Sequence, residues 1–208
     1  MATSLEAYLV ELSSANDWHG IIEAGNLFSV EEKTKFLWAW PSVASLAWLK
    51  RILTENHIGN ILSVGCGSGL LEWLISKTTG VNVVGLELDK SWWKSAYSPT
   101  TFIDIKFTER QITSEFLKKC IQAEPSQFAL LFCYFNNRKA FLEYVRAYSG
   151  DLVIIVGPNS EQHIVTDPNP LKPNFESDEW SLLDFCQFND QFSNCMSIFK
   201  RRKYNKEK

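Results

Sequence analysis

The residues with the clearest chemical potential form a glycine-rich run, Gly65-Cys66-Gly67-Ser68-Gly69, directly after the apolar run 60–64. Because glycine has no Cβ atom, a ligand can approach such a backbone closely, and positive φ angles cost little. The apolar spacing of residues 70–76 predicts a helix whose N-terminus offers free N–H groups and a positive dipole end. The pattern indicates a loop that binds the polar portion of a small ligand.

An acidic residue lies at the distance from this loop that a nucleotide-like ligand requires. Glu87 follows Gly67 by 20 residues and stands near the end of the next apolar run, 81–88. A carboxylate at the end of the second strand of a parallel sheet typically accepts hydrogen bonds from ribose hydroxyls. Glu87 is therefore the expected ribose contact, and Asp89 is the next candidate.

Apolar, β-rich runs alternate with stretches of helical periodicity along most of the chain. This alternation predicts right-handed strand–helix–strand units and one open, mostly parallel sheet with helices on both faces. The expected strands are 60–64, 81–88, 101–107, 128–133 and 152–156, and the expected helices are 43–53 (with Ser42 as its N-cap), 70–76, 114–123 and 138–148, preceded by weaker helical periodicity at 3–15 and 29–38.

The last quarter of the chain has a different character. Residues 157–175 are rich in Pro and Asn and predict a loop, and 178–185 predict a last short helix. Residues 188–200, broken around Asn189-Asp190, predict a hairpin-like pair that gives the sheet an antiparallel C-terminal strand. We expect a single α/β domain over residues 1–208, made of a helical N-terminal element (1–57), an α/β core (58–200) and a basic tail (201–208).

The glycine order is Gly-x-Gly-x-Gly, whereas dinucleotide enzymes have Gly-x-Gly-x-x-Gly. With its flanking strand, 61–70, and the acidic segment 84–89, it resembles the class I S-adenosylmethionine (SAM) dependent methyltransferases. The resemblance implies a Rossmann-like sheet and SAM as cofactor, with the ribose at Glu87, the adenine beside Leu88 and the amino-acid end near Cys133. The cofactor contacts that it implies are Gly65, Cys66, Gly67, Ser68, Gly69, Glu87, Leu88 and Cys133.

The sequence departs from this family at two places. The family usually has an acid two residues before the first glycine, where it helps to hold the amino group of the cofactor, but Ser63 occupies that position here. Family members that methylate base amines or amide nitrogens typically have an Asn/Asp-Pro-Pro-aromatic turn, whereas residues 133–137 read Cys-Tyr-Phe-Asn-Asn. These departures motivate an alternative, a catalytically inactive methyltransferase-like scaffold or binding subunit.

Aromatic and amide side chains are the candidates for an acceptor site. Tyr134, Phe135 and Asn136 would stand at the mouth of the pocket, where rings stack and an amide orients a nucleophile. The alternative for this segment is a strand end followed by an N-cap at Asn137. Many family members fold an N-terminal element over the cofactor.

Within the N-terminal segment 36–42, Trp38 and Trp40 are candidates to cover the site, and packing in the core is an equal alternative for both. Methyl transfer depends mostly on alignment, and a base is needed only when the acceptor arrives protonated. The catalytic candidates are therefore few: Tyr134, Asn136 and His163, of which His163 has a surface-loop role as its alternative.

The composition sets the remaining expectations. A chain of 208 residues, 45% hydrophobic, suits one globular domain, and the net charge of −3 does not indicate a nucleic-acid partner. Neither a signal peptide nor a membrane span is expected. The five cysteines contain no Cys-x-x-Cys pair, which predicts reduced thiols, no metal site and a cytoplasmic or nuclear location.

The leading hypothesis is therefore a SAM-dependent methyltransferase whose acceptor is a small molecule, a protein side chain or an RNA. The inactive scaffold, which would work through a protein partner, is the first alternative. An α/β nucleotide-binding protein of other chemistry, such as a reductase, is the second, and the glycine order disfavours it. The basic tail is expected to be a solvated chain end, with a nuclear-import signal or a nucleic-acid contact as the alternative.

Overall fold

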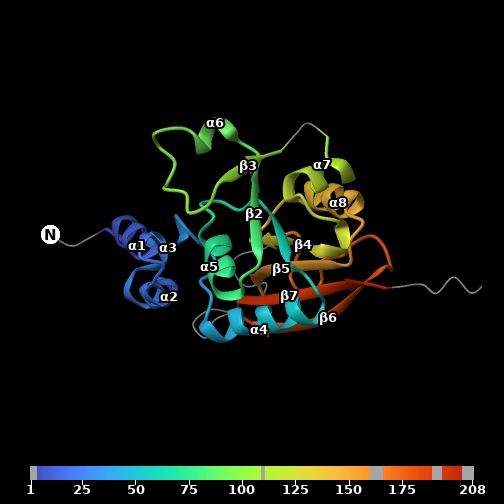
Figure 1. Ribbon diagram of the computed structural model, residues 1–208, viewed down its shortest axis with the longest axis horizontal. Helices are drawn as coiled ribbons and strands as arrows, with labels where there is room; N and C mark the ends of the chain where they lie inside the picture. Colours follow the sequence, from blue (N-terminus) through green and yellow to red (C-terminus); the bar gives the residue numbers. More distant parts are fainter. Residues whose placement is uncertain (1–3, 109–110, 160–165, 189–193, 203–208) are drawn as a thin grey trace, which may run out of the picture.

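A computed structural model describes residues 4–108, 111–159, 166–188 and 194–202. At its centre is a seven-stranded sheet in the order β3-β2-β1-β4-β5-β7-β6 (Figure 1). The first five strands pair in parallel, and β7 lies antiparallel between β5 and β6. The strands are β1 (Asn60–Val64), β2 (Asn82–Glu87), β3 (Ile105–Phe107), β4 (Phe128–Cys133), β5 (Leu152–Pro158), β6 (Trp180–Gln187) and β7 (Asn194–Arg201).

Helices cover both faces of the sheet, as Figure 1 shows with α4 and α5 on one side and α7 and α8 on the other. Alternation along β1 explains the two layers, because Ile61 packs into the core cluster of α4 and α5 while Leu62 packs into that of α7 and α8. The helices are α1 (Leu5–Ser14), α2 (Trp18–Leu27), α3 (Val30–Thr34), α4 (Val43–Glu55), α5 (Leu70–Thr79), α6 (Lys90–Trp93), α7 (Ser114–Ile121) and α8 (Arg138–Ala147), with a 3₁₀ turn at Pro125–Gln127.

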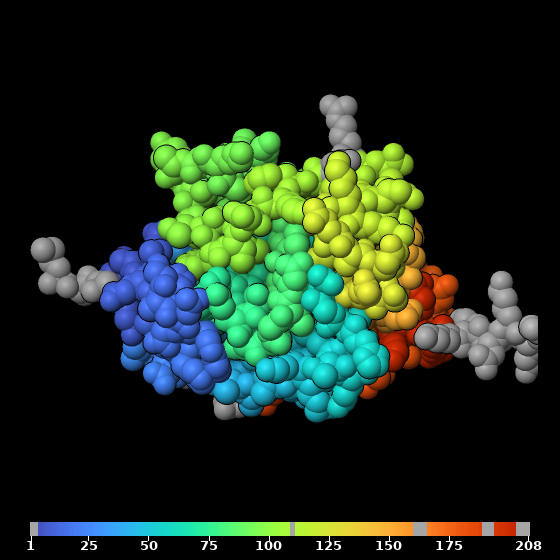
Figure 2. Space-filling view, in the orientation of Figure 1, coloured from blue at the N-terminus to red at the C-terminus, as the bar shows by residue number. Residues whose placement is uncertain are grey.

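The N-terminal helices share a hydrophobic core with the sheet. Leu9 of α1 and Ile21 of α2 are fully buried in the same cluster as Leu74 of α5. The Glu6 carboxylate of α1 accepts hydrogen bonds from the N–H and the hydroxyl of Thr100, at 2.9 and 2.7 Å. In the space-filling view the blue N-terminal helices accordingly lie against the yellow-green segment that follows α6 (Figure 2).

The predicted α/β architecture is confirmed, with a mostly parallel sheet, an antiparallel strand near the C-terminus and helices on both faces. The predicted limits of β1 and β4 match the structure, and Ser42 caps α4 as expected. The cap is reciprocal, because the Ser42 and Ser45 side chains each accept a hydrogen bond from the other residue's N–H at 3.1 Å.

The predicted helix over 178–185 is wrong, because this segment is the edge strand β6. A register shift between Leu182 and Asp184 leaves Leu183 as a bulged residue, which breaks the period-two alternation that identifies a strand. Pairing with β7 then decides the conformation. The hairpin expected within 188–200 therefore has its first strand earlier, and the Asn189-Asp190 break lies outside the described residues.

Two smaller differences concern segments near the site. Residues 101–104, expected to begin β3, are not part of that strand. Helix α2 was not anticipated, since Gly20 and Gly25 within it lower its intrinsic helix propensity. No helix in the described parts of the chain is long and apolar enough to cross a membrane.

Candidate functional site

The glycine run forms the turn between β1 and α5, and all three glycines have positive φ. The φ angles are 72° at Gly65, 59° at Gly67 and 77° at Gly69, a region that side chains with a Cβ rarely adopt. The sheet order changes direction at β1, whose neighbours are β2 on one side and β4 on the other. Parallel sheets bind ligands at such a switch point, beyond the carboxyl ends of the strands.

Glu87 lies directly against this turn. Its Oε1 accepts a hydrogen bond from the Gly67 N–H at 2.7 Å, and its Oε2 accepts one from the Leu88 N–H at 3.2 Å. The structure thus brings together the two residues that the 20-residue spacing pairs. Leu88 is 79% exposed beside them, so its side chain is free to contact a ligand.

A buried acid that sequence reasoning missed lies on the other side of the turn. Glu72, in the first turn of α5, is 1% exposed, and its Oε1 accepts a hydrogen bond from the Ser63 hydroxyl at 2.6 Å. Its Oε2 has no hydrogen-bond partner among the described residues. Burial raises the pKa of Glu72 to about 7, against the effect of the Ser63 hydrogen bond. We call Ser63, residues 65–69, Glu72 and Glu87 the glycine-loop cluster.

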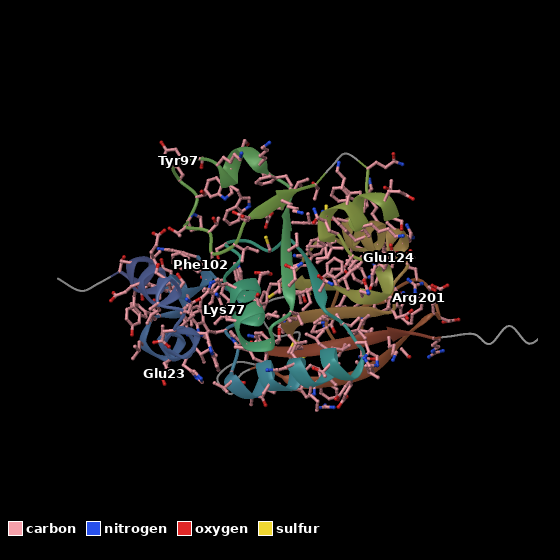
Figure 3. The ribbon with its side chains drawn as sticks, in the orientation of Figure 1. Glu23, Lys77, Tyr97, Phe102, Glu124 and Arg201 are labelled. Carbon is pink, nitrogen blue, oxygen red and sulfur yellow. The ribbon has the colours of Figure 1, made fainter. Side chains whose placement is uncertain are left out.

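The segment 101–104 packs on the turn and explains Gly69 of the turn and Gly85 of β2. The Phe102 N–H donates to the Ser68 carbonyl at 2.8 Å, and Figure 3 shows Phe102 on the segment after α6, beside the N-terminal helices. A Cβ added at Gly69 would lie 2.3 Å from a side-chain atom of Ile103. One at Gly85 would lie 2.7 Å from another atom of Ile103 and 2.5 Å from the Cys66 sulfur. Only the tertiary arrangement reveals this contact, because the segment has no sequence signal other than its apolar residues.

A second group, which we call the Tyr134 cluster, consists of Trp38, Tyr134 and Asn194. The Tyr134 hydroxyl donates to Asn194 Oδ1 at 2.6 Å, and the Trp38 ring stacks on the Tyr134 ring with centroids 5.7 Å apart. Burial raises the pKa of Tyr134. Trp38 is 55% exposed, so most of its other surface is available for contact.

The segment 36–40 joins the two groups, and we call it the strap. At its start, the Phe36 carbonyl accepts a hydrogen bond from the Ser68 hydroxyl at 2.7 Å. In its middle, Trp38 reaches Tyr134. At its end, Trp40 is buried, and its indole N–H donates to the carbonyls of Ile21 and Ile22 at 3.2 and 3.1 Å. Trp38 therefore packs against Tyr134, and its place in a binding site stays a prediction. Trp40 packs in the core, which was the alternative interpretation of that residue.

The other predicted residues take different places. Phe135 packs on Phe132 and would be 3.1 Å from a Cβ at Gly65, so it supports the turn. Asn136 is exposed and forms an isolated bridge with Asp167. The Asn137 side chain accepts from the Ala140 N–H at 3.0 Å and caps α8, which confirms the alternative interpretation of that segment.

The cysteine residues of the site are partly buried. Cys66 and Cys133 are free, and burial raises the pKa of both thiols, with the nearby Glu72 carboxylate as a second cause. Both therefore stay protonated at neutral pH. Among the described residues, no group of three or more His, Cys, Asp or Glu side chains is arranged to hold a metal ion. His163 lies outside the described residues.

No protein-family model matches the sequence, and no curated protein matches it. Several solved structures, in contrast, are similar to this chain. MtNAS in complex with MTA and tNA is 9% identical with a TM-score of 0.56, over 94% of this chain and 69% of that one. A mutant of MtNAS in complex with S-adenosylmethionine is 10% identical with a TM-score of 0.55, over 93% and 72%.

A third similar structure, the 16S rRNA methylase ArmA, is 14% identical with a TM-score of 0.46, over 89% of this chain and 98% of that one. The likeness to MtNAS runs along almost the whole chain. The chain therefore has a Rossmann-like α/β fold, which it shares with MtNAS.

Proposed function

We propose that this protein binds SAM at the glycine-loop cluster and transfers its methyl group to an acceptor beside the Tyr134 cluster. The observation that carries the proposal is the contact between Glu87 and Gly67 at the switch point of the sheet. A carboxylate held there is placed to accept hydrogen bonds from ribose hydroxyls, while a turn with little side-chain bulk admits the rest of the cofactor. The complex of MtNAS with S-adenosylmethionine supports this assignment by analogy of fold.

Different residues of the chain would contact different parts of the cofactor. Glu87 orients the ribose, Leu88 covers one face of the adenine, and backbone at the glycine turn and at Cys133 lies against the amino-acid portion. The bound sulfonium supplies an activated methyl group, so the protein contributes mainly alignment. The strap closes the site from the side of the N-terminal helices, because it is hydrogen-bonded to Ser68 at one end and anchored by Trp40 at the other.

The Tyr134 cluster is the proposed acceptor side. Trp38 offers an exposed ring surface for stacking, and Asn136 offers an exposed amide nearby in sequence. Tyr134 is a poor general base at neutral pH, since burial raises its pKa and its proton is donated to Asn194. An acceptor with a free lone pair, on a small molecule, a protein side chain or an RNA, therefore fits this side best.

The first experiment separates binding from transfer. Purified protein is titrated with SAM by calorimetry, and SAM with a labelled methyl group is then incubated with small-molecule, protein and RNA fractions of a cell extract. Saturable binding with label in one fraction supports the proposal and identifies the acceptor class. No heat at high micromolar SAM would overturn it.

Binding without transfer to any fraction would favour the second candidate, an inactive scaffold that works through a protein partner. Two observations favour that candidate: Ser63 stands where the family has an acid, and Asn137 is used as a helix cap. The single-domain organisation, the cytoplasmic or nuclear location and the role of the basic tail stay predictions.

A further inference from the structure

We propose that Glu72 supplies the carboxylate that binds the amino group of the cofactor, and so takes over the task of the acid that position 63 lacks. This inference rests on the proposed SAM site and assigns one residue within it. It concerns a side chain on α5, whereas the family motif has its acid on β1.

The first support is the shared position of the two residues. Alternation along β1 directs Ser63 to the same face of the sheet as Ile61, the face that α5 covers. Glu72 enters that layer from the first turn of α5, and its Oε1 lies 2.6 Å from the Ser63 hydroxyl. An acid on the helix and a short hydroxyl on the strand thus occupy the space that a longer acidic side chain on the strand would fill.

The second support is the half-satisfied carboxylate. Glu72 is 1% exposed, and its Oε2 has no hydrogen-bond partner among the described residues. A buried carboxylate is costly unless its oxygens are paired, so such a group calls for a ligand or a functional explanation. An acid that only stabilised the N-terminus of α5 would gain the same helix-dipole energy while exposed to solvent, as Glu115 is in the first turn of α7.

The third support is the charge of the surroundings. The groups that face Glu72 are the Ser63 hydroxyl from β1, the Cys66 thiol from the glycine turn, the Glu87 carboxylate from β2 and the Cys133 thiol from β4. None of these four groups is a cation, and the Glu87 carboxylate raises the pKa of Glu72 further. An ammonium group is the ligand that would neutralise this carboxylate, and the amino-acid end of SAM carries one.

The test compares two ligands that differ in the amino-acid portion. S-adenosylhomocysteine has the amino group, and 5′-methylthioadenosine shares the adenosine and the thioether but lacks the amino-acid end. Calorimetry with the full chain should show that Glu72→Gln weakens S-adenosylhomocysteine binding by about 10- to 100-fold, the range for a hydrogen bond to a charged group. Binding of methylthioadenosine should change less than about twofold, and the exposed control Glu115→Gln should change neither.

A double variant examines the exchange of positions directly. Ser63→Asp combined with Glu72→Gln returns an acid to the strand, and it should recover part of the lost affinity for S-adenosylhomocysteine. Equal weakening of both ligands by Glu72→Gln, or no weakening of either, would overturn the assignment and leave the SAM site standing. A wild-type protein that binds neither ligand would overturn the SAM site together with the assignment.

A second measurement needs no variant, should Glu72→Gln fail to fold. Because burial raises the pKa of Glu72 to about 7, an ammonium that binds at pH 6.5 displaces a proton from this carboxylate. Titrations of the wild type in two buffers of different ionisation enthalpy count that proton. Release with S-adenosylhomocysteine and none with methylthioadenosine is the expected result, and equal counts for the two ligands would overturn the proposal.

Discussion

The glycine-loop cluster and the Tyr134 cluster differ in how the chain assembles them. The first comes entirely from residues 63–87, a single strand–helix–strand unit in which the turn, the buried acid and the part-buried acid follow one another. The second joins Trp38, Tyr134 and Asn194, which lie in the strap, after β4 and at the start of β7. Local sequence can therefore specify the glycine turn and Glu87 in the first cluster, whereas the second cluster exists only once the sheet is complete.

This difference has a functional meaning. A fold can keep its cofactor site while the acceptor side changes, because the acceptor side depends on loops and on the N-terminal element. The strap touches both clusters, through Phe36 and Trp38. Substitutions in the strap and in the glycine turn would show whether the two clusters are as separable as their assembly suggests.

The largest effect should come from the two tryptophans of the strap. Trp40→Ala removes a buried ring and its hydrogen bonds to α2 and should lower the free energy of unfolding by about 3–5 kcal/mol. Trp38→Ala removes a half-exposed ring and should cost less than about 1 kcal/mol while it impairs methyl transfer. Urea unfolding of the two variants measures the contrast, and equal losses would show that Trp38 is a structural residue.

The buried acid gives the glycine-loop cluster a pH dependence. The pKa of Glu72 is about 7 in the folded chain against an ordinary value of 4.5. Between pH 4.5 and about 7 the folded chain therefore keeps a proton on Glu72 that the unfolded chain has lost. Its contribution to stability is complete below pH 4.5 and is lost as the pH rises to about 7.

Relative to Glu72→Gln, the wild type should therefore lose roughly 2–4 kcal/mol of unfolding free energy across this window. Urea unfolding without ligand at pH 5 and pH 7.5 measures the difference, and Glu115→Gln serves as the control at an exposed site. A difference that stays constant with pH would mean that Glu72 has an ordinary pKa.

Two glycines of the turn should separate folding from binding. Gly69→Ala combines positive φ with an overlap on Ile103 and should cost about 2–4 kcal/mol of stability. Gly67→Ala has similar strain but no atom within 4 Å of the new Cβ, so it should cost about 1–2 kcal/mol. The new Cβ at position 67 would point into the open space in which we propose that SAM binds, so Gly67→Ala should weaken SAM binding more than its loss of stability explains. Calorimetry would measure the loss of affinity, and urea unfolding would measure the loss of stability.

A final effect concerns the part-buried acid at the end of β2. Glu87→Ala should weaken SAM binding by about 1–3 kcal/mol, because the ribose hydroxyls lose a charged acceptor. Asp89→Ala is the control, since that carboxylate accepts from the Trp92 N–H and caps α6. If Glu87→Ala binds SAM as the wild type does, Asp89 becomes the candidate for the ribose contact.

The sequence by itself determined the α/β class, the limits of β1 and β4 and the pairing of Glu87 with the glycine turn. These features follow from periodicity and from spacing within one strand–helix–strand unit, where few conformations satisfy the backbone. It also pointed to Ser63 as a departure from the family pattern, although it offered no replacement for the missing acid.

Only the tertiary structure decided the rest. Packing of α5 on β1 brings Glu72 to Ser63, and packing on α2 separates Trp40 from Trp38, although the two tryptophans are neighbours in the same strap. The edge strand β6 likewise takes its conformation from β7, since a bulge hides its own alternation. In each case the contact forms only when helices and strands pack against one another. Periodicity and local spacing report on one segment at a time, so they do not encode these contacts.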